Sequence, residues 1–232
     1  MKRESPDRPM TKIAIYDMDR TITVSGTYTP FLLHVGARMA PWRLVLALCI
    51  PFVMLAYVLR LIPRSRLKEI NQALMIGHNV RRDRLQPHIE SYADRVMARN
   101  VRKGALEQIA RDRAEGYRLV LATASYRLYV EAIAARLGFD AVIATDHLSQ
   151  DLDYVRAKIA GENCYDAAKL RMIREWMAGE GITRTASHIR AYSDHVSDAP
   201  MLDFADEAYA ANPHPPLAKL AQLRGWKRFD WT

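Results

Sequence analysis

The chain carries three short apolar runs, and each of them ends in acidic or hydroxyl side chains. These runs are KIAIYD at residues 12–17, YRLVLATAS at 117–125 and HIRAYSD at 188–194. Segments of helical character separate them, for example at 102–116 and 128–137. Buried strands that alternate with helices are typical of a parallel sheet covered on both faces. The sequence therefore predicts a three-layer α/β fold around a mostly parallel sheet.

Further elements are expected between and after these runs. The stretch at 28–100 is helical in character, with apolar residues at Leu67, Ile70 and Leu74 that keep helical spacing. Gly138 is expected to end the preceding helix. The other expected elements are strands at 141–145 and 207–212, a small hairpin at 148–161, and helices at 167–181 and 198–205.

The composition favours an anionic partner. Lysine and arginine number 34 against 26 acids, which gives a net charge of +8 over 232 residues. Nucleic acid, a phosphorylated metabolite and an acidic membrane face would all suit this balance. The basic residues are scattered, with no zinc-ligand spacing and no aromatic–basic motif, so no nucleic-acid partner is expected. Cys49 and Cys164 form no CxxC pair, which favours a reducing compartment.

Side chains that suit a phosphate or a cation stand at the predicted carboxyl ends of three strands. In parallel α/β sheets, ligands bind at this edge. The three sets are Asp17 with Asp19, Thr123 with Ser125, and Asp194 with Asp198.

The first set holds two carboxylates separated by a single residue. Asp17 and Asp19 repel each other unless a cation or a shared proton intervenes. One could be a nucleophile and metal ligand, and the other a general acid that protonates a leaving group. A helix cap or a solvated turn is the alternative, and it is the commoner role for such a pair in isolation.

The other candidates carry similar alternatives. The Thr123 hydroxyl could hold a phosphate oxygen, or it could cap the following helix. Lys169 could neutralise a phosphate and a nucleophilic carboxylate, although most lysines are solvated. Asp194 and Asp198 lie four residues apart after a strand, where gathered carboxylates suit Mg²⁺. His195 is expected to be a loop residue rather than a ligand.

These motifs occur in a fixed order: a strand with DxDxT, a strand ending in threonine, a helical lysine, and a strand with DxxxD. In this order they resemble the haloacid dehalogenase (HAD) superfamily of aspartate-nucleophile hydrolases. The likeness is to its phosphoserine-phosphatase-like members, subfamily IB, and it covers nearly the whole chain. It implies a Rossmann-like hydrolase core from residues 1–27 and 101–232, with an inserted all-helical cap of the C1 type at 28–100.

The resemblance also implies a role for each residue of the set. Asp17 would attack phosphorus and form an aspartyl phosphate, while Asp19 would protonate the leaving oxygen and then activate water. Thr123 and Lys169 would hold the phosphoryl group. The implied cofactor is Mg²⁺, bound by the Asp17 carboxylate, the Asp19 backbone carbonyl and Asp194, with Asp198 as outer support.

One segment departs from the phosphoserine phosphatases. They carry a glutamate shortly after the first motif that helps to read the amino acid, whereas the stretch after Arg20 is TITVSGTYTPF, without an acid. This departure weakens phosphoserine as the substrate. Arg20 stands beside the catalytic pair, where a small residue is common. It would bind a second anionic group of the substrate, or else face solvent or the cap.

The run LVLALCIPFVMLAYVL at 44–59 has no charged or strongly polar side chain. A spanning helix needs about 20 apolar residues, whereas this run is shorter and has Pro51 near its middle. A single crossing would also separate Asp17 from Asp194, so the site could not form. Either the run is the buried centre of the cap, or residues 44–62 contact an anionic membrane. Headgroups would then meet Arg38, Arg43, Arg60, Arg64, Arg66 and Lys68.

Together these observations predict a Mg²⁺-dependent phosphatase that acts through an aspartyl phosphate on a small or lipid-linked phosphomonoester. The lipid alternative resembles phosphatidylglycerophosphate-type phosphatases at the membrane surface, since some relatives with hydrophobic caps use phosphatidylglycerol phosphate. Phosphotransfer to an acceptor other than water is another alternative, as is a membrane-associated binding role without catalysis. We expect a cytoplasmic protein, peripheral on the inner face of the membrane if the lipid alternative holds.

Overall fold

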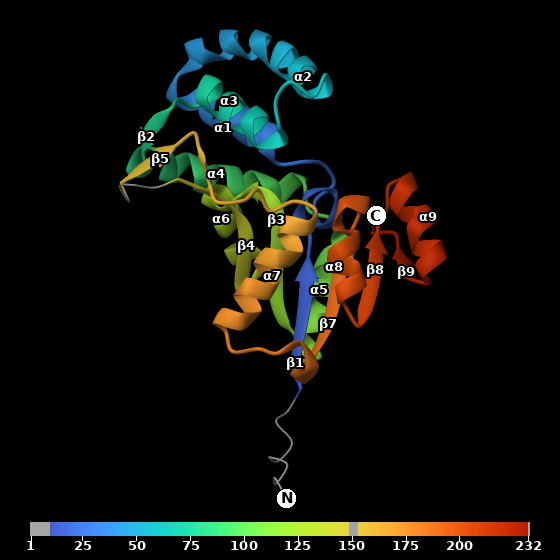
Figure 1. Ribbon diagram of the computed structural model, residues 1–232. Coiled ribbons are helices and arrows are strands. Elements are labelled where there is room, and N and C mark those ends of the chain that lie inside the picture. The colour runs from blue at the N-terminus through green and yellow to red at the C-terminus, as the bar shows by residue number, and fades with distance from the viewer. Residues whose placement is uncertain (1–9, 149–152, 232) are drawn as a thin grey trace, which may run out of the picture.

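The computed structural model describes residues 10–148 and 153–231, and its centre is a seven-stranded sheet (Figure 1). The strand order is β6-β4-β3-β1-β7-β8-β9, and every neighbouring pair is parallel except β4 with β6. This confirms the predicted α/β architecture. The strands are β1 (Thr11–Tyr16), β3 (Arg118–Tyr126), β4 (Ala141–His147), β6 (Ile159–Ala160), β7 (Ser187–Ser193), β8 (Glu207–Ala211) and β9 (Lys227–Phe229).

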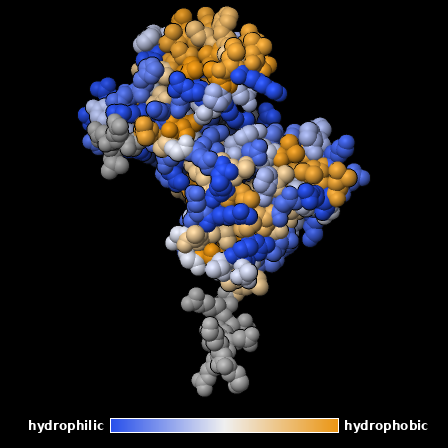
Figure 2. Space-filling model, in the orientation of Figure 1, coloured by the Kyte–Doolittle hydropathy of each residue, from blue (hydrophilic) through white to orange (hydrophobic). Residues whose placement is uncertain are grey.

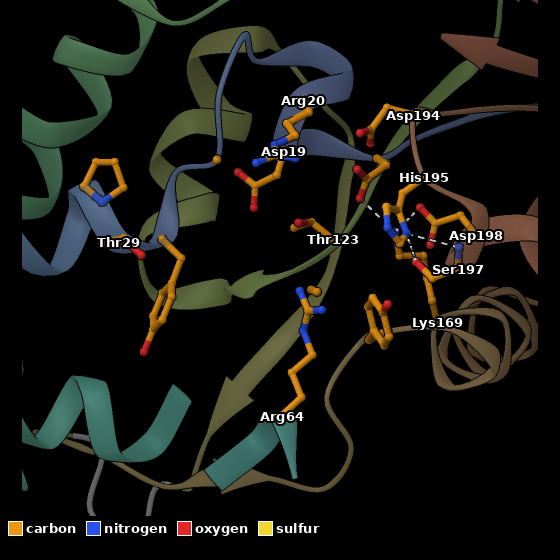
Figure 3. Close-up of a pocket in the computed structure, with 16 residues that line it drawn as sticks. Asp19, Arg20, Thr29, Arg64, Thr123, Lys169, Asp194, His195, Ser197 and Asp198 are labelled. Atoms are coloured by element: carbon orange, nitrogen blue, oxygen red, sulfur yellow. Dashed lines mark hydrogen bonds and ion pairs between the residues drawn. The ribbon is translucent and has the colours of Figure 1, made fainter. Parts of the chain in front are cut away.

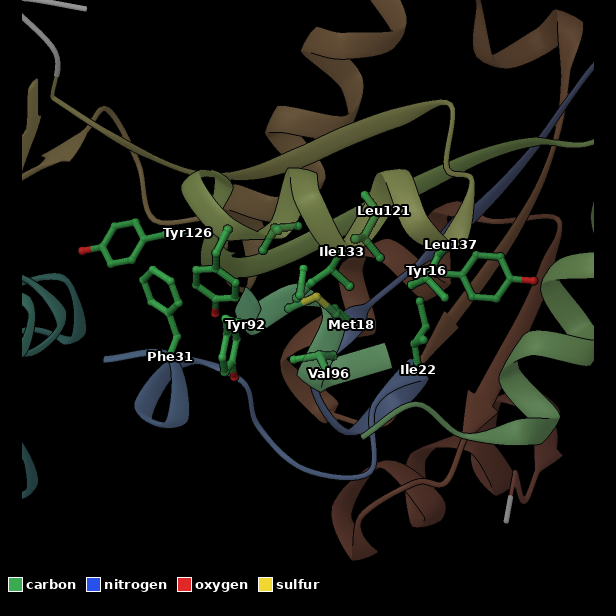
Figure 4. Packing of buried hydrophobic residues seen from close by; sticks show 14 of the residues in the cluster. Tyr16, Met18, Ile22, Phe31, Tyr92, Val96, Leu121, Tyr126, Ile133 and Leu137 are labelled. Carbon is green, nitrogen blue, oxygen red and sulfur yellow. The ribbon is translucent and has the colours of Figure 1, made fainter. Parts of the chain in front are cut away.

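Helices cover both faces of the sheet, because successive side chains of a strand point to opposite sides. Ile13 and Ile15 of β1 pack in one hydrophobic cluster, whereas Ala14 and Tyr16 belong to the other. The first cluster includes residues of α7 (Ala167–Gly179), α8 (Ala199–Phe204) and α9 (Pro215–Arg224). The second includes residues of α5 (Lys103–Ala114) and α6 (Arg127–Leu137), and Figure 4 shows part of it.

The segment between β1 and α5 holds most of the remaining helices. It contains α1 (Tyr28–Met39), η2 (Pro41–Cys49), α2 (Ile50–Val58), α3 (Arg64–Met75), β2 (Asn79–Arg81) and α4 (Arg82–Arg99). Its last helix, α4, packs on α6 and contributes Ile89, Tyr92 and Val96 to the second cluster. The division into core and cap at residues 28 and 100 stays a prediction.

The prediction that residues 28–100 are all helical is wrong at β2. This strand pairs antiparallel with β5 (Tyr154–Arg156), which lies more than seventy residues further along the chain. Gly77, with φ +127°, follows the end of α3 and lets the chain turn into the strand. A pairing partner so distant leaves no local pattern in the sequence.

The hairpin predicted at 148–161 is also wrong as a pairing, although residues 149–152 lie outside the described residues. Its two strands exist, but β5 pairs with β2 while β6 pairs with the end of β4. The carboxyl-terminal helix α9 and strand β9 were not predicted, and β9 extends the sheet beyond β8. Three-residue strands such as β9 are too short to show an alternating pattern.

The apolar run is not the buried centre of the cap. Residues 41–58 form η2 and α2, which arch over α1 and α3 at the top of the molecule (Figure 1). This is the one segment among the described residues long and apolar enough to cross a membrane, and none of its residues is buried. Figure 2 shows its apolar side chains on the outer surface, so of the two alternatives for this run the buried cap centre is wrong.

Candidate active site

The turn that follows β1 carries the first candidate carboxylates. Asp17 is buried and is fixed by its backbone N–H, which donates to the Tyr192 carbonyl at 2.9 Å. The chain then makes a wide turn over Met18–Ile22 (η1) in which Arg20 has φ +65°. Strand register places Tyr16 level with Leu121 of β3 and with Tyr192 of β7. The three strands therefore end at the same edge, as the sequence predicts.

Lys169 lies between two buried carboxylates. Its Nζ donates to Asp17 Oδ1 at 2.8 Å and to Asp198 Oδ2 at 2.7 Å, and its side chain is 3% exposed. Burial by itself lowers the pKa of Lys169, but attraction to Asp17 and Asp198 outweighs burial and raises it. The lysine therefore stays charged and joins α7 to the end of β1 and to the start of α8.

The pKa of Asp17 is raised to about 8, chiefly by burial. Repulsion by Asp198 and Asp194 raises it further, whereas Lys169 opposes the shift. Burial also raises the pKa of Asp194, to about 6. In both groups burial is the main cause, and repulsion from neighbouring carboxylates adds to it.

Thr21 connects Asp17 with Asp194. Its buried hydroxyl lies 3.3 Å from Asp17 Oδ2 and 3.1 Å from Asp194 Oδ1, and it accepts a hydrogen bond from the Asp194 backbone N–H at 2.9 Å. A hydroxyl has one proton, so it donates to one carboxylate at a time. Thr21 thereby sets the spacing of the two acids.

Asp198 is held at the start of α8, as predicted. Its Oδ2 accepts from the Ser193 hydroxyl at 2.7 Å as well as from Lys169. Its Oδ1 is buried and has no hydrogen-bond partner within the described parts of the chain. A buried carboxylate oxygen left without a partner is costly, which points to a group that would complete it.

Asp19 is anchored on the opposite side of the turn. Its Oδ1 accepts from both the backbone N–H and the hydroxyl of Thr27 at 2.7 Å, and its Oδ2 accepts from the Ser125 hydroxyl at 2.6 Å. The carboxyl groups of Asp17 and Asp19 thus have separate sets of partners. Separate environments are what two carboxylates need if they are to play different chemical roles.

Thr123 does not cap a helix. It lies inside β3, which continues to Tyr126 past an irregularity in its pairing with β4, and α6 begins only at Arg127. Its buried hydroxyl accepts the Ser125 backbone N–H at 3.1 Å. Figure 3 shows Thr123 facing the same space as Asp19, Asp194 and Lys169.

A pocket of about 550 Å³ opens over these residues. Asp17, Asp19, Thr123, Lys169, Asp194 and Asp198 all line it. Tyr28 and Thr29 of α1 and Arg64 of α3 supply part of its wall from the inserted segment. Figure 3 shows Arg64 reaching from the start of α3 toward the carboxylates.

Arg20 also lines the pocket, and its side chain is exposed. Within residues 10–148 and 153–231, neither Arg20 nor Arg64 forms an ion pair with a carboxylate. The Arg64 guanidinium instead lies over the Tyr165 ring, 4.2 Å from its centroid. His195 is at the wall too, where its ring bonds Ser197 and stacks on His214, in keeping with a loop role.

The donor set fits a divalent cation. Asp17, Asp194 and Asp198 carry three negative charges when ionised, against one positive charge on Lys169. Over the described residues, no group of three or more His, Cys, Asp or Glu side chains has metal-binding geometry. The expected set, however, has two carboxylates and a backbone carbonyl, and Mg²⁺ keeps several waters. The excess negative charge agrees with such an ion, and the unpartnered Asp198 oxygen could accept a hydrogen bond from one of its waters.

Sequence reasoning missed the residues that position this site. Thr21 stands in the DxDxT motif, four residues after Asp17, and this spacing was its only signal. Thr27 and Ser193 carry no local signal, because their partners lie elsewhere in the chain. Arg64 was considered only as a headgroup contact, whereas the structure also places it at the pocket.

A family model described as haloacid dehalogenase-like hydrolase matches residues 14–203. Protein CicA of Caulobacter vibrioides is 30% identical over 213 residues, which cover 88% of this chain and 90% of that protein. The "Probable phosphatase Rv3661" of Mycobacterium tuberculosis is 36% identical over 125 residues. That match spans 53% of this chain and less than half, 41%, of the relative's own length.

Two solved structures show the same fold. A protein of unknown function from Bordetella pertussis Tohama I has a TM-score of 0.85 at 23% identity, covering 96% of this chain and all of that one. A phosphoserine phosphatase, solved as an analogue of its phospho-aspartyl intermediate, has a TM-score of 0.62 at 16% identity. That likeness covers 96% of this chain and 94% of that one. By the match of its sequence and by its fold, the chain belongs to the haloacid dehalogenase-like hydrolase family.

Proposed function

We propose that the protein is a Mg²⁺-dependent phosphomonoesterase that acts through an aspartyl phosphate on Asp17. The observation that carries the proposal is the buried contact of Asp17 with Lys169, which line one pocket together with Asp194 and Thr123. Phosphoryl transfer depends mainly on positioning and on charge stabilisation, and these residues supply both.

In the first step, a carboxylate oxygen of Asp17 attacks phosphorus, and the bond from phosphorus to the leaving oxygen breaks. Asp19 donates its proton to that oxygen, so an alcohol leaves. In the second step, Asp19 removes a proton from water, whose oxygen attacks phosphorus and releases Asp17 and inorganic phosphate. Lys169 and the Thr123 hydroxyl hold the phosphoryl oxygens, while Thr27 and Ser125 keep Asp19 oriented.

Mg²⁺ would be held by the carboxylates of Asp17 and Asp194 and by the Asp19 carbonyl, with Asp198 supporting Lys169 beside it. When bound, the ion would neutralise phosphate charge that develops during transfer. Thr21 would keep the Asp17 and Asp194 carboxylates at the spacing the ion requires.

The substrate is a small or lipid-linked phosphomonoester. Arg20 would bind a second anionic group of that substrate, because it lines the pocket without an acidic partner in the described chain. Kinetics of Arg20→Ala test this role. A selective rise in KM for substrates with a second anion supports it, and an equal loss on every phosphomonoester contradicts it.

A lipid-linked phosphomonoester is the second candidate substrate class. It is favoured by the exposed apolar residues of η2 and α2 on the same inserted segment that supplies Arg64 to the pocket. Transfer of the phosphoryl group to an acceptor other than water remains an alternative. Product analysis with added alcohols distinguishes it, since a transferase would yield alkyl phosphates in place of inorganic phosphate.

The direct test is a screen of small phosphometabolites, phospholipid monoesters and an aryl phosphate, with and without Mg²⁺. Wild-type protein should release phosphate only with the metal. Asp17→Asn should be inactive, whereas Asp203→Asn, at an exposed acid on α8, should match wild type. Hydrolysis that survives in Asp17→Asn would reject the proposed nucleophile. No hydrolysis of any substrate by wild type would favour a binding role.

A further inference from the structure

The segment between α1 and α3 presents an apolar surface that nothing in the described chain covers. We call residues 41–61 the apolar arm. Phe52 is 73% exposed, and Leu48 and Leu61 are each 72% exposed. Two thirds of the large hydrophobic residues that the structure leaves exposed belong to this arm: Trp42, Leu44, Val45, Leu48, Phe52, Met54, Leu55, Val58, Leu59 and Leu61. Figure 2 shows them gathered at the top of the molecule, away from the sheet.

Such a patch on a soluble surface marks an interaction site. A dispersed set of exposed leucines would need no explanation, but these residues are contiguous in sequence and lie on two adjoining elements. The question is therefore which partner covers the apolar arm.

The charges around the arm answer this question. Residues 20–68 contain seven lysines and arginines and not one aspartate or glutamate. The expectation that Lys68 meets headgroups is wrong, because Lys68 is buried and donates to the Ala124 carbonyl. Arg20 and Arg64 line the pocket, and Arg66 pairs with Glu69.

Arg38 and Arg60 stand at the two ends of the arm and are exposed, and their side chains form no ion pair in the described structure. An apolar surface with an exposed, unpaired arginine near each end complements an anionic lipid surface, where acyl chains lie beneath negative headgroups.

The geometry places the arm along a surface rather than across a membrane. Its two halves, η2 and α2, both pack on α3, so the arm is held to the body along its length. The Arg43 guanidinium donates to the carbonyls of Ala73 and Leu74 at 3.0 Å and fixes the start of the arm to the end of α3. Trp42 lies under the same guanidinium, 4.8 Å from ring centroid to Arg43 Cζ, and tryptophan is enriched at membrane interfaces.

A second copy of the chain fits the arm less well. Face-to-face pairing through the arm would bring two sets of arginines together without an acid between residues 20 and 68 to offset them. Juxtaposed like charges oppose association. Headgroup phosphates remove that repulsion.

We infer that the apolar arm docks the protein on an anionic phospholipid membrane, lying in the plane of the interface with its apolar side chains among the upper acyl chains. Arg64, which lines the pocket, follows Leu61 by three residues, so docking brings one wall of the pocket toward the headgroups. This last consequence rests on the proposed phosphatase function, and it would favour phosphomonoesters that are carried by lipids. Docking itself does not depend on catalysis.

The test is flotation of the full chain with vesicles of zwitterionic phospholipid, with and without an anionic phospholipid. Wild type should float with the anionic vesicles, and added salt should weaken this binding. Leu48→Glu/Phe52→Glu should bind at least roughly tenfold more weakly, since two deeply inserted apolar groups become charged. Arg38→Gln should bind more weakly only to anionic vesicles.

Leu223→Glu is the matched control, because Leu223 is 74% exposed on α9 and lies outside the arm. It should float like wild type. Hydrolysis of a soluble aryl phosphate should be unchanged in Leu48→Glu/Phe52→Glu, which shows that the variant is folded. Asp17→Asn should float normally, so a failed phosphatase proposal would leave docking intact.

Wild type that stays with the soluble fraction on anionic vesicles would overturn the inference. So would flotation that is equal in Leu48→Glu/Phe52→Glu and wild type. A dimer in lipid-free solution that Phe52→Glu dissociates, together with no vesicle binding, would assign the arm to a second copy of the chain instead.

Discussion

The candidate active site and the apolar arm differ in which kind of side chain each buries and which it exposes. At the site, charged groups that would prefer water are buried, and each is held by partners such as Lys169, Thr21 and Ser193. On the arm, apolar groups that would prefer burial are exposed without partners. Either arrangement costs free energy in the isolated protein. For both regions we propose a partner outside the chain: a cation and a phosphate at the site, and a lipid surface at the arm.

Removal of the buried Lys169 charge should have the largest effect on turnover and on stability. Lys169→Met leaves Asp17 and Asp198 buried without their shared partner. We expect turnover to fall by on the order of 10³-fold. Without Mg²⁺, unfolding should become easier by about 3–5 kcal/mol.

Steady-state kinetics and thermal unfolding, with Mg²⁺ and with chelator, measure both effects. Lys219→Met on α9 is the matched control, because Lys219 is exposed. If Lys169→Met keeps wild-type turnover, the buried ion pair is structural only and the proposed phosphoryl contact is wrong.

The metal site should show the next largest effect. Asp194→Asn removes one of the two carboxylates expected to bind Mg²⁺, while the amide keeps the shape of the side chain. We expect the Mg²⁺ concentration for half-maximal activity to rise by at least about tenfold. In wild type, Mg²⁺ at about 100 times its Kd should stabilise the fold by about 2.7 kcal/mol.

Titration of activity and of Tm against Mg²⁺ checks this prediction, with Asp203→Asn as the control. A chelator should abolish wild-type activity, and restored Mg²⁺ should recover it. Full activity in the presence of chelator, or an unchanged Mg²⁺ titration in Asp194→Asn, would argue against the ion at this position.

Thr21→Val should have an intermediate effect on both stability and turnover. The substitution keeps the shape but leaves the buried Asp194 N–H without its acceptor, which costs about 1–3 kcal/mol of stability. Turnover should fall by about tenfold, because Asp17 and Asp194 lose the hydroxyl between them. Thr21→Ser should restore both properties. Wild-type turnover in a less stable Thr21→Val would limit the hydroxyl to a structural role.

A substitution on the apolar arm should have the smallest effect on stability. Phe52→Ala should change the free energy of unfolding by no more than about 0.5 kcal/mol, because its side chain is already exposed. Phe31→Ala, at a buried position of α1, should cost about 3–5 kcal/mol. Chemical denaturation of both variants gives the comparison. A large loss for Phe52→Ala would mean that the arm is covered in solution.

The local sequence predicts the active-site residues better than it predicts the exposure of the apolar arm. Asp17, Thr123 and Asp194 were located because each lies at or just beyond an apolar run, and parallel strands bring such ends to one edge. Their partners Thr27 and Ser193 could not be found in this way, since the contacts depend on how distant segments pack.

The apolar run shows the limit of composition most clearly. LVLALCIPFVMLAYVL reads the same whether it is buried or exposed, so the sequence left two alternatives. Only the packing of α1 and α3 beneath it decides that its outer side chains face outward. The β2–β5 pairing escaped prediction for a similar reason, because neither three-residue strand specifies its partner.

Detection of a phosphoryl group on Asp17 tests the central claim most directly. Asp19→Asn should slow the attack of water while still allowing transfer from an aryl phosphate, whose leaving group needs no proton. Mass spectrometry of this variant, quenched in acid after reaction with Mg²⁺ and the aryl phosphate, should show a phosphorylated peptide modified at Asp17. A protein that turns over the aryl phosphate without modification at Asp17, or with the phosphoryl group on another residue, would contradict the account.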